Sequence, residues 1–412
     1  MLDRSPQPET SSARNIYAFG LTSFFNDTAT EMAYWVLPAF LVSLGAGPAQ
    51  LGVIEGIAES VASFAKLFSG YLADRMERRK PLVVAGYFVA NAVKPLLAFV
   101  TAWWHILLIR FSDRLAKGVR GAPRDVMVAE SVGKERLGSA YGLIQSLDSA
   151  GAIAGPLLAL VLLARFGIRH VFLAAAIPGA LAVLVALFGI RETKNPAVDQ
   201  DQSPHFSQNQ GEVGHPYSEI GAGGTARLPM TFYFVLAAVT LFSLGNSSDM
   251  FLVMRAQNVG IRVSLAPLLG LVFNVTYTLG SWPAGWFSDR FSRRWIAAAG
   301  YLIFAVVYFV FGRAPSTKAI WITMAVYGFY YALTQPVLKA LVVDTVAKDI
   351  RGRALGIYFF VTSVATLAAS LITGELWRQH GAAVPFYLSA GLALVSAMML
   401  AISPSPTETS GA

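Results

Sequence analysis

Apolar segments long enough to cross a membrane recur along almost the whole 412-residue chain. A helix needs about 20 apolar residues to span the hydrocarbon core of a bilayer. Twelve segments meet this requirement, with approximate bounds 16–44, 49–72, 81–102, 104–126, 138–164, 170–190, 229–254, 264–287, 295–313, 319–343, 353–377 and 384–402. Hydrophobic residues make up 55% of the chain and charged residues only 14%. A water-soluble fold could not bury this much apolar surface, so the sequence predicts an all-α integral membrane protein.

Several residue types that catalytic and metal sites require are missing from the expected spans. The chain has no cysteine, which excludes disulfides, thiolate metal ligands and a cysteine nucleophile. The five histidines lie between the apolar segments or at the very start of one, at His105, His170, His205, His215 and His380. No phosphate-binding G-x-x-x-x-G-K-[ST] motif is present, so ATP is not the expected energy source. We therefore expect no enzyme activity, no metal site and no cofactor.

Lysine and arginine residues concentrate in the short loops on one side of the membrane. With the N-terminus inside, the cytoplasmic loops receive about twice as many of them as the opposite loops, as the positive-inside rule describes. Both termini are therefore predicted to be cytoplasmic. The net charge of +8 reflects these loops rather than a nucleic-acid partner. The first 15 residues lack a signal-peptide pattern, and without a eukaryotic targeting segment we expect a multi-pass protein of the bacterial inner (plasma) membrane.

A polar stretch over residues 191–228 divides the apolar segments into two groups of six. It is rich in Gln, Asn, Ser, Pro and Gly, and this composition predicts a disordered cytoplasmic linker. The sequence thus predicts an N-terminal six-helix bundle over residues 1–190 and a C-terminal six-helix bundle over residues 229–412.

The two halves repeat one another at a nearly constant spacing. The segment GYLADRMERR, residues 70–79, recurs as GWFSDRFSRR, residues 285–294. Glu130-Ser-Val recurs at almost the same distance as Asp344-Thr-Val, and so does a G-x-A-x-G element. Parallel repeats of six helices, related by an axis along the membrane normal, are the plan of major facilitator transporters.

The loop between the second and third spans carries the strongest resemblance to a known family. Its residues resemble the signature G-x-L-A-D-R-x-G-R-[RK] of the major facilitator superfamily, with Glu77 in place of the second glycine. The resemblance covers essentially the whole chain and implies twelve transmembrane helices in two six-helix bundles. In that family the loop latches the two halves at the cytoplasmic face. This implies a gating role for the residues of both copies: Gly70, Asp74, Arg75, Arg78, Arg79, Gly285, Asp289, Arg290, Arg293 and Arg294.

Two further segments are similar to elements of efflux proteins in this superfamily. Gly151, Gly155 and Pro156 in span five resemble the G-x-x-x-G-P element of drug–proton antiporters, although Ala159 and Leu160 replace the glycine pair that follows it there. Small residues at this spacing let helix backbones approach closely. The segments Phe25–Met32 and Arg110–Asp125 resemble those of bacterial efflux permeases.

Charged residues inside the first-half spans are the main functional candidates, because a charge at the bilayer centre costs about 2.5–3.5 kcal/mol. Residues at i, i+3, i+4 and i+7 of span four form one helical stripe: Arg110, Asp113, Arg114 and Lys117. Acids of spans one, two and five are expected to face this stripe: Asp27, Glu31, Glu55, Glu59 and Asp148. Structural ion pairs are also expected, first between Asp113 and Arg110 or Arg114. Lys94 in span three has no assigned role.

The second half carries far fewer charges inside its spans. Asn246 and Asp249 in span seven are candidates, and Asp249 matches Glu31 in the repeat. The other inward polar and aromatic candidates are Asn274, Tyr277, Tyr327, Tyr330, Tyr331, Gln335, Tyr358 and Thr362. This asymmetry predicts ion coupling in the N-terminal bundle and a substrate pocket shaped by the C-terminal bundle.

These observations predict a proton-coupled secondary active transporter of small molecules that works by alternating access and functions as a monomer in the lipid bilayer. Burial favours the neutral form of a carboxylate and a nearby arginine favours the charged form. An acid that meets arginine in only one conformation would therefore bind and release a proton in each cycle. The candidates are Asp27, Glu31, Glu59 and Asp148, with Arg110 and Arg114 as partners.

The direction and substrate class stay open between several readings. The expected function is export, by antiport, of a cationic or amphipathic compound that competes with protons for these acids. The basic stripe could instead bind an organic anion, or the protein could carry a sugar, and either would give proton symport. A non-transporting membrane sensor or enzyme is a remote alternative.

Overall fold

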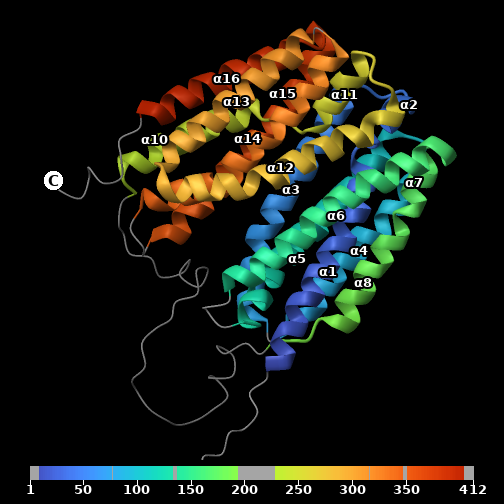
Figure 1. Cartoon of the computed structure of the whole chain (residues 1–412), viewed down its shortest axis with the longest axis vertical. Helices are drawn as coiled ribbons and strands as arrows, with labels where there is room; N and C mark the ends of the chain where they lie inside the picture. The colour runs from blue at the N-terminus through green and yellow to red at the C-terminus, as the bar shows by residue number, and fades with distance from the viewer. Residues whose placement is uncertain are drawn as a thin grey trace, which may run out of the picture.

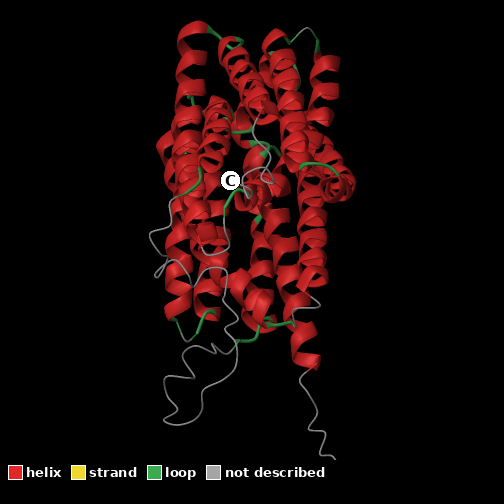
Figure 2. Ribbon diagram, turned by 90° about the vertical axis from the view of Figure 1, so that its left-hand side faces the viewer, coloured by secondary structure: helices red, strands yellow, loops and turns green. Residues whose placement is uncertain are grey.

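The computed structural model describes most of the chain, namely residues 9–76, 78–132, 137–193, 228–314, 316–346 and 350–402. These residues form helices joined by short loops, with no strand among them. Figure 2 shows the helices running side by side along the long axis of the molecule. The predicted all-α, multi-span fold is confirmed.

The first half of the chain folds into helices that follow the predicted spans closely. They are α1 (Glu9–Tyr34), α2 (Leu37–Ser43), α3 (Pro48–Arg75), α4 (Lys80–Val93), η1 (Lys94–Phe99), α5 (Trp103–Glu130), α6 (Leu137–Phe166), α7 (Ile168–Ala174) and α8 (Ala176–Gly189). The short helices α2, η1 and α8 continue the rods begun by α1, α4 and α7. Span one therefore contains a break, at residues 35–36, that the sequence did not predict.

The second half repeats this plan. Its helices are α10 (Met230–Gly245), α11 (Met250–Asn258), η4 (Val263–Leu265), α12 (Ala266–Arg290), α13 (Arg293–Arg313), α14 (Thr317–Asp344), α15 (Arg351–His380) and α16 (Val384–Ile402). The predicted seventh span is interrupted at residues 246–249, between α10 and α11. The described residues are thus consistent with the twelve predicted spans.

Eight of these rods are long and apolar enough to cross a membrane on composition alone. The others, built on α1, α3, α5 and α14, contain most of the charged residues and tyrosines that the sequence analysis singles out. The hydropathy of these four helices is low because they carry polar groups that face the inside of the protein.

The two halves of the chain form two bundles that meet at one end (Figure 1). We call this end, where α2 and α11 lie, the far side, and the end where α8 stops and α10 starts, the linker side. Between the bundles, α3 packs along α15 and α6 along α12. Ser60 donates a hydrogen bond to the carbonyl of Ser363 (3.2 Å), and Phe64 meets Phe360 with ring centroids 5.7 Å apart.

Toward the linker side the bundles separate, as Figure 1 shows. Gly142 of α6 and Gly356 of α15 lie near the linker-side ends of these helices, and a Cβ at either position would meet nothing within 4 Å. On the far side, by contrast, a Cβ at Gly56 would lie 3.2 Å from the carbonyl oxygen of Leu367. The protein is therefore closed on the far side and open toward the linker side.

Small residues in α6 set the distance between α6 and α1. A Cβ at Gly155 would lie 2.7 Å from the carbonyl oxygen of Thr28 and 3.0 Å from the amide nitrogen of Met32. Gly151 makes a similar close approach to Phe24. Pro156 follows within the same long helix. The G-x-x-x-G-P element therefore joins two helices of one bundle.

We expect the Gly155→Val substitution to destabilise the protein by about 1–3 kcal/mol, because the added side chain forces α1 away from α6. The measurement is thermal unfolding of the purified protein in detergent. Gly142→Val is the matched control, since it makes the same change on the same helix with open space around it. Equal destabilisation by both variants would contradict this account of the α1–α6 contact.

Candidate functional site

A polar cavity of about 290 Å³ lies inside the N-terminal bundle. It is lined by α1, α3, α5 and α6, with Tyr87 of α4 at its wall. Its charged lining residues are Asp27, Glu59, Lys66, Arg114, Lys117, Arg120, Arg124, Asp125 and Asp148. A second cavity of about 360 Å³ shares Arg124 and Asp148 and extends along α6 to Tyr141 and Gly142, at the linker side. We call the two adjoining cavities together the polar cavity.

Several charges of the polar cavity are paired across helices. Arg114 Nη2 lies 3.1 Å from Glu59 Oε1, which joins α5 to α3. Asp125 of α5 lies 3.7 Å from Lys66 Nζ of α3 and 3.1 Å from Arg124 Nη2. The basic stripe of span four thus meets acids of span two, as the spacing predicts.

Asp27 and Asp148 form a different kind of pair. Asp27 of α1 and Asp148 of α6 both line this one cavity, from different helices. Asp27 accepts a hydrogen bond from Asn26 Nδ2 at 3.0 Å. Two adjacent carboxylates cannot both ionise cheaply, and such a pair is stabilised by one shared proton. This carboxyl pair is open to the linker side through the cavity.

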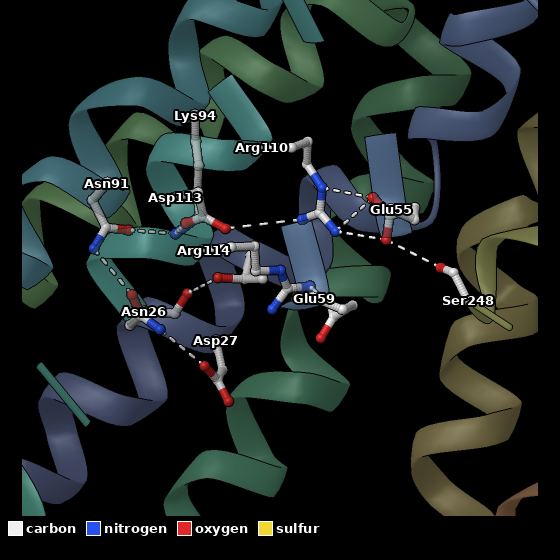
Figure 3. Close-up of polar contacts among 11 residues, drawn as sticks. Asn26, Asp27, Glu55, Glu59, Asn91, Lys94, Arg110, Asp113, Arg114 and Ser248 are labelled. Atoms are coloured by element: carbon white, nitrogen blue, oxygen red, sulfur yellow. Dashed lines mark hydrogen bonds and ion pairs between the residues drawn. The ribbon is translucent and has the colours of Figure 1, made fainter. Parts of the chain in front are cut away.

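A continuous line of buried polar side chains leads from Asp27 to the other bundle (Figure 3). We call it the buried network, and its members in order are Asp27, Asn26, Asn91, Lys94, Asp113, Arg110, Glu55 and Ser248. The six members between Asp27 and Ser248 are each no more than 6% exposed. Ser248 belongs to the break between α10 and α11, so the network ends at the C-terminal bundle.

The strongest link of the buried network is between Arg110 and Glu55. Arg110 Nε and Nη2 donate to the two carboxylate oxygens of Glu55, each at 2.8 Å. This two-point geometry is the strongest form of an arginine–carboxylate contact. Ser248 Oγ donates to the same carboxylate at 3.0 Å. Glu55 therefore joins span four of one bundle to span seven of the other.

Lys94, which the sequence left unassigned, closes the middle of the buried network. Its Nζ lies 3.4 Å from Asp113 Oδ1 and donates to Asn91 Oδ1 at 3.2 Å. Asp113 also lies 3.8 Å from Arg110 Nη1, so the predicted pairing with Arg110 is present and Lys94 is the additional partner. Asn91 precedes Lys94 by one helical turn. That spacing was the available signal for this contact.

Glu31 does not join the acids that face the basic stripe, contrary to the expectation. Its carboxylate accepts hydrogen bonds from Trp35 Nε1 at 2.6 Å and from Asn274 Nδ2 of α12 at 3.2 Å. Residues four apart on a helix differ by about 40° in direction. Glu31 therefore stays on nearly the same face of α1 as Asp27, one turn nearer the far side, and there its carboxylate contacts α12 of the other bundle.

In the C-terminal bundle, Asp249 lies at the start of α11 beside the tyrosines of α14. Tyr327 and Tyr331 donate their hydroxyls to its two oxygens at 2.7 and 2.9 Å. Tyr330 and Phe273 pack against Tyr331 with centroids 5.1 and 5.0 Å apart. The structure thus brings Asp249 together with predicted pocket residues of span ten. Of the other predicted pocket residues, Tyr358 is buried, and Tyr277 and Thr362 are partly exposed. The side chain of Gln335 lies outside the described residues.

The repeated loop motif builds the same ion pair in each bundle. Arg79 Nη1 lies 2.6 Å from Glu130 at the end of α5, and Arg293 Nη1 lies 2.5 Å from Asp344 at the end of α14. Glu192 also accepts hydrogen bonds from the first amides of α4, where a carboxylate is stabilised by the helix dipole. The acids of the two ion pairs, Glu130 and Asp344, are aligned with each other by the repeat.

The other motif residues are described only in part. Arg78 is exposed, Gly70 lies near Ala122, and Arg294 lies beside the ring of Trp295. The side chains of the remaining members lie outside the described residues: Asp74, Arg75, Gly285, Asp289 and Arg290. Their predicted latch therefore stays a prediction.

Two helical bundles that meet on one side and diverge on the other are the plan of membrane transporters of the alternating-access class. The sequence model of the Major Facilitator Superfamily matches residues 19–254 and 230–412. The chain belongs to this superfamily, so it is a multi-pass membrane transporter of small molecules. The predicted family and fold are confirmed.

Relatives and solved structures agree with this assignment. The chain is 31% identical to an uncharacterized MFS-type transporter of Methanocaldococcus jannaschii over 407 residues, 97% of each chain. It is 23% identical to the multi-drug resistance efflux pump PmrA of Streptococcus pneumoniae, over 86% of this chain and 88% of that one. The solved nucleoside transporter NupG matches with a TM-score of 0.70 at 16% identity, over 94% and 98% of the two chains. An inward-facing bacterial homolog of the human lysosomal transporter Spinster gives 0.67 at 15% identity, over 97% and 96%.

Proposed function

We propose that this protein is a proton-coupled antiporter that exports a cationic or amphipathic compound. The observation that carries the proposal is that two acids of different helices, Asp27 and Asp148, line one cavity, and that the adjoining cavity reaches Tyr141 and Gly142 at the linker side. We further propose that the linker side is the cytoplasm of a bacterial inner membrane, with residues 191–228 linking two bundles and one chain as the working unit.

The carboxyl pair provides the exchange step. In the open state, the proton held between Asp27 and Asp148 leaves to the linker side, and the freed negative charge binds the cationic group of the substrate. After the bundles reorient, a proton from the far side displaces the substrate. Because proton and substrate compete for the same carboxylates, the two move across the membrane in opposite directions.

The buried network provides the link between this step and the movement of the bundles. Asn26 donates to Asp27 at one end, and Ser248 donates to Glu55 at the other. A change of charge on Asp27 changes the strength of the hydrogen bond from Asn26, and through Asn26 it changes the hydrogen bonds of Asn91 and Lys94. The Glu55–Ser248 contact, which holds the far side closed, is the last member of this series.

Export is favoured by what the similar proteins are named for. The Streptococcus pneumoniae relative is an efflux pump, and a relative of Dickeya zeae, 32% identical over 191 residues, is a multidrug resistance protein. The acids of the polar cavity supply the attraction for a cation that such a substrate needs.

The basic residues of the polar cavity support a second candidate, proton symport of an organic anion. Five basic side chains line the cavity beside four acids, and two of these acids, Glu59 and Asp125, are already paired with basic side chains. Lys117 is exposed to the cavity. An anionic group that binds Lys117 would reverse the charge preference of the site.

Proton movement in liposomes separates the two candidates. The purified protein is reconstituted with a pH dye inside and challenged with cationic drugs, organic anions and sugars. We expect an external cation to drive protons out of the liposomes. Proton entry with an anion or a sugar would instead support symport, and no response to any cation would contradict the proposed antiport.

A further inference from the structure

The helix of span seven is interrupted inside the membrane-spanning region. Residues 246–249 carry the sequence Asn-Ser-Ser-Asp, and they follow Gly245, the last residue of α10. Asn, Ser and Asp side chains compete for backbone hydrogen bonds and so favour helix ends. Irregular backbone at this depth is tolerated only where it is buried in protein or lines a cavity, and in transporters such breaks hold coupling ions.

The charge of Asp249 at this break is not balanced by a basic side chain in the described part of the chain. Its partners are the neutral hydroxyls of Tyr327 and Tyr331. Arg255, the nearest basic residue along the helix, instead donates to the carbonyls of Phe311 and Gly312. In the N-terminal bundle, by comparison, the buried Glu55 is paired with Arg110. A single positive charge beside Asp249 would neutralise its negative charge.

Two oxygen atoms of this break, and the hydroxyl of a tyrosine whose ring lies beside Tyr327, are buried and have no hydrogen-bond partner among the described residues. They are Asn246 Oδ1, Ser247 Oγ and the hydroxyl of Tyr308. Ser247 is 4% exposed and Tyr308 is 1% exposed. The ring of Tyr308 lies 6.2 Å from the ring of Tyr327, whose hydroxyl donates to Asp249. Because each unpaired buried polar group costs about 1–3 kcal/mol, the three together call for a ligand.

The chemistry of these atoms selects the ligand. The carboxylate, amide oxygen and hydroxyls are hard oxygen donors, which suit alkali and alkaline-earth ions. One carboxylate balances one positive charge, and no cluster of three or more acidic, His or Cys residues that would suit a divalent ion occurs in the described residues. We propose that the break between α10 and α11 binds Na⁺ through Asp249, Asn246, Ser247 and the hydroxyl of Tyr308.

This site lies in the C-terminal bundle, separate from the Asp27–Asp148 pair, and it goes beyond the proposed proton antiport. Ser248, between Ser247 and Asp249, is the residue that contacts Glu55 across the bundles. Sodium at the break therefore fixes the backbone that presents Ser248, which stabilises the closed far side.

Equilibrium binding of sodium to the full-length protein in detergent tests the proposal without any transport step. Thermal unfolding is measured in sodium chloride and in choline chloride at equal ionic strength, together with binding of radioactive sodium. We expect saturable binding of one ion per chain and a rise in Tm of about 2–4 °C with sodium alone. Equal Tm values in the two salts, with no saturable binding, would overturn the site.

Two variants localise the site. Asp249→Asn is expected to abolish the sodium-dependent rise, and Ser247→Ala, which keeps the charge, is expected to weaken sodium affinity by about 10-fold. Glu31→Gln is the matched control because it neutralises an acid of the other bundle that also accepts hydrogen bonds from neutral side chains, and it should bind sodium normally. Sodium binding unchanged in both Asp249→Asn and Ser247→Ala would overturn the assignment. Asp27→Asn should retain sodium binding. Sodium binding therefore tests this site independently of the proposed proton antiport.

Discussion

Replacement of Asp27 by Asn is expected to reduce substrate-driven proton movement to the level of protein-free liposomes. Asparagine has nearly the same shape as aspartate, but it cannot take up a proton at neutral pH. The same loss is expected for Asp148→Asn, because both carboxyls are needed to share the proton. Relief of the repulsion between the two carboxylates should leave the thermal stability of either variant undiminished.

The control for this prediction is Glu375→Gln, which removes an exposed acid that pairs with Arg378 near the far-side end of α15. It should transport like the unmodified protein. Binding of the substrate gives a further distinction, since a cation that competes with the proton loses affinity in Asp27→Asn, whereas an anion does not. Full proton movement in both Asp27→Asn and Asp148→Asn would remove the carboxyl pair from the mechanism.

The second large effect is expected from Arg110→Ala. This change leaves Glu55, which is fully buried, and Asp113, which is 6% exposed, without their shared arginine. Removal of one partner from a buried ion pair typically costs about 3–5 kcal/mol. We expect a large fall in Tm in detergent and a low yield of folded protein in membranes.

Arg110→Lys gives an intermediate case, because an ammonium group restores the charge but not the two parallel hydrogen bonds. Arg378→Ala is the matched control, since that arginine also pairs with a glutamate but lies exposed to solvent. It should leave the Tm unchanged. If Arg110→Ala melts at the temperature of the unmodified protein, the buried network does not support the fold as described.

The spans could be predicted because apolar length is a local property of the sequence. The predicted segment 384–402 has the bounds of α16, and 295–313 differs from α13 by two residues at its start. The predictions were less accurate where polar residues interrupt a span. The break at residues 246–249 was missed because the apolar residues on both sides read as one continuous segment.

The candidate site was predictable in part. The i, i+3, i+4 and i+7 spacing on α5 placed Arg110 and Arg114 on one face, and they do meet acids of α3, namely Glu55 and Glu59. The repeat aligned Glu130 with Asp344, and each pairs with one of the two arginines that end its copy of the loop motif, Arg79 and Arg293. Both results follow from short-range periodicity or from internal symmetry, which sequence carries directly.

By itself, then, the sequence determined that the chain folds in a membrane, where its spans lie, that its halves repeat, and which charged residues lie inside the spans. Only the tertiary structure decided which of those charges meet. It paired Glu31 with Asn274 and Lys94 with Asp113, and it placed Asp148 and Asp27 around one cavity. These choices depend on how whole helices rotate and cross, and that is set by packing at many positions such as Gly155. A difference of a few tens of degrees in rotation changes the partner of a buried charge without altering any local sequence pattern.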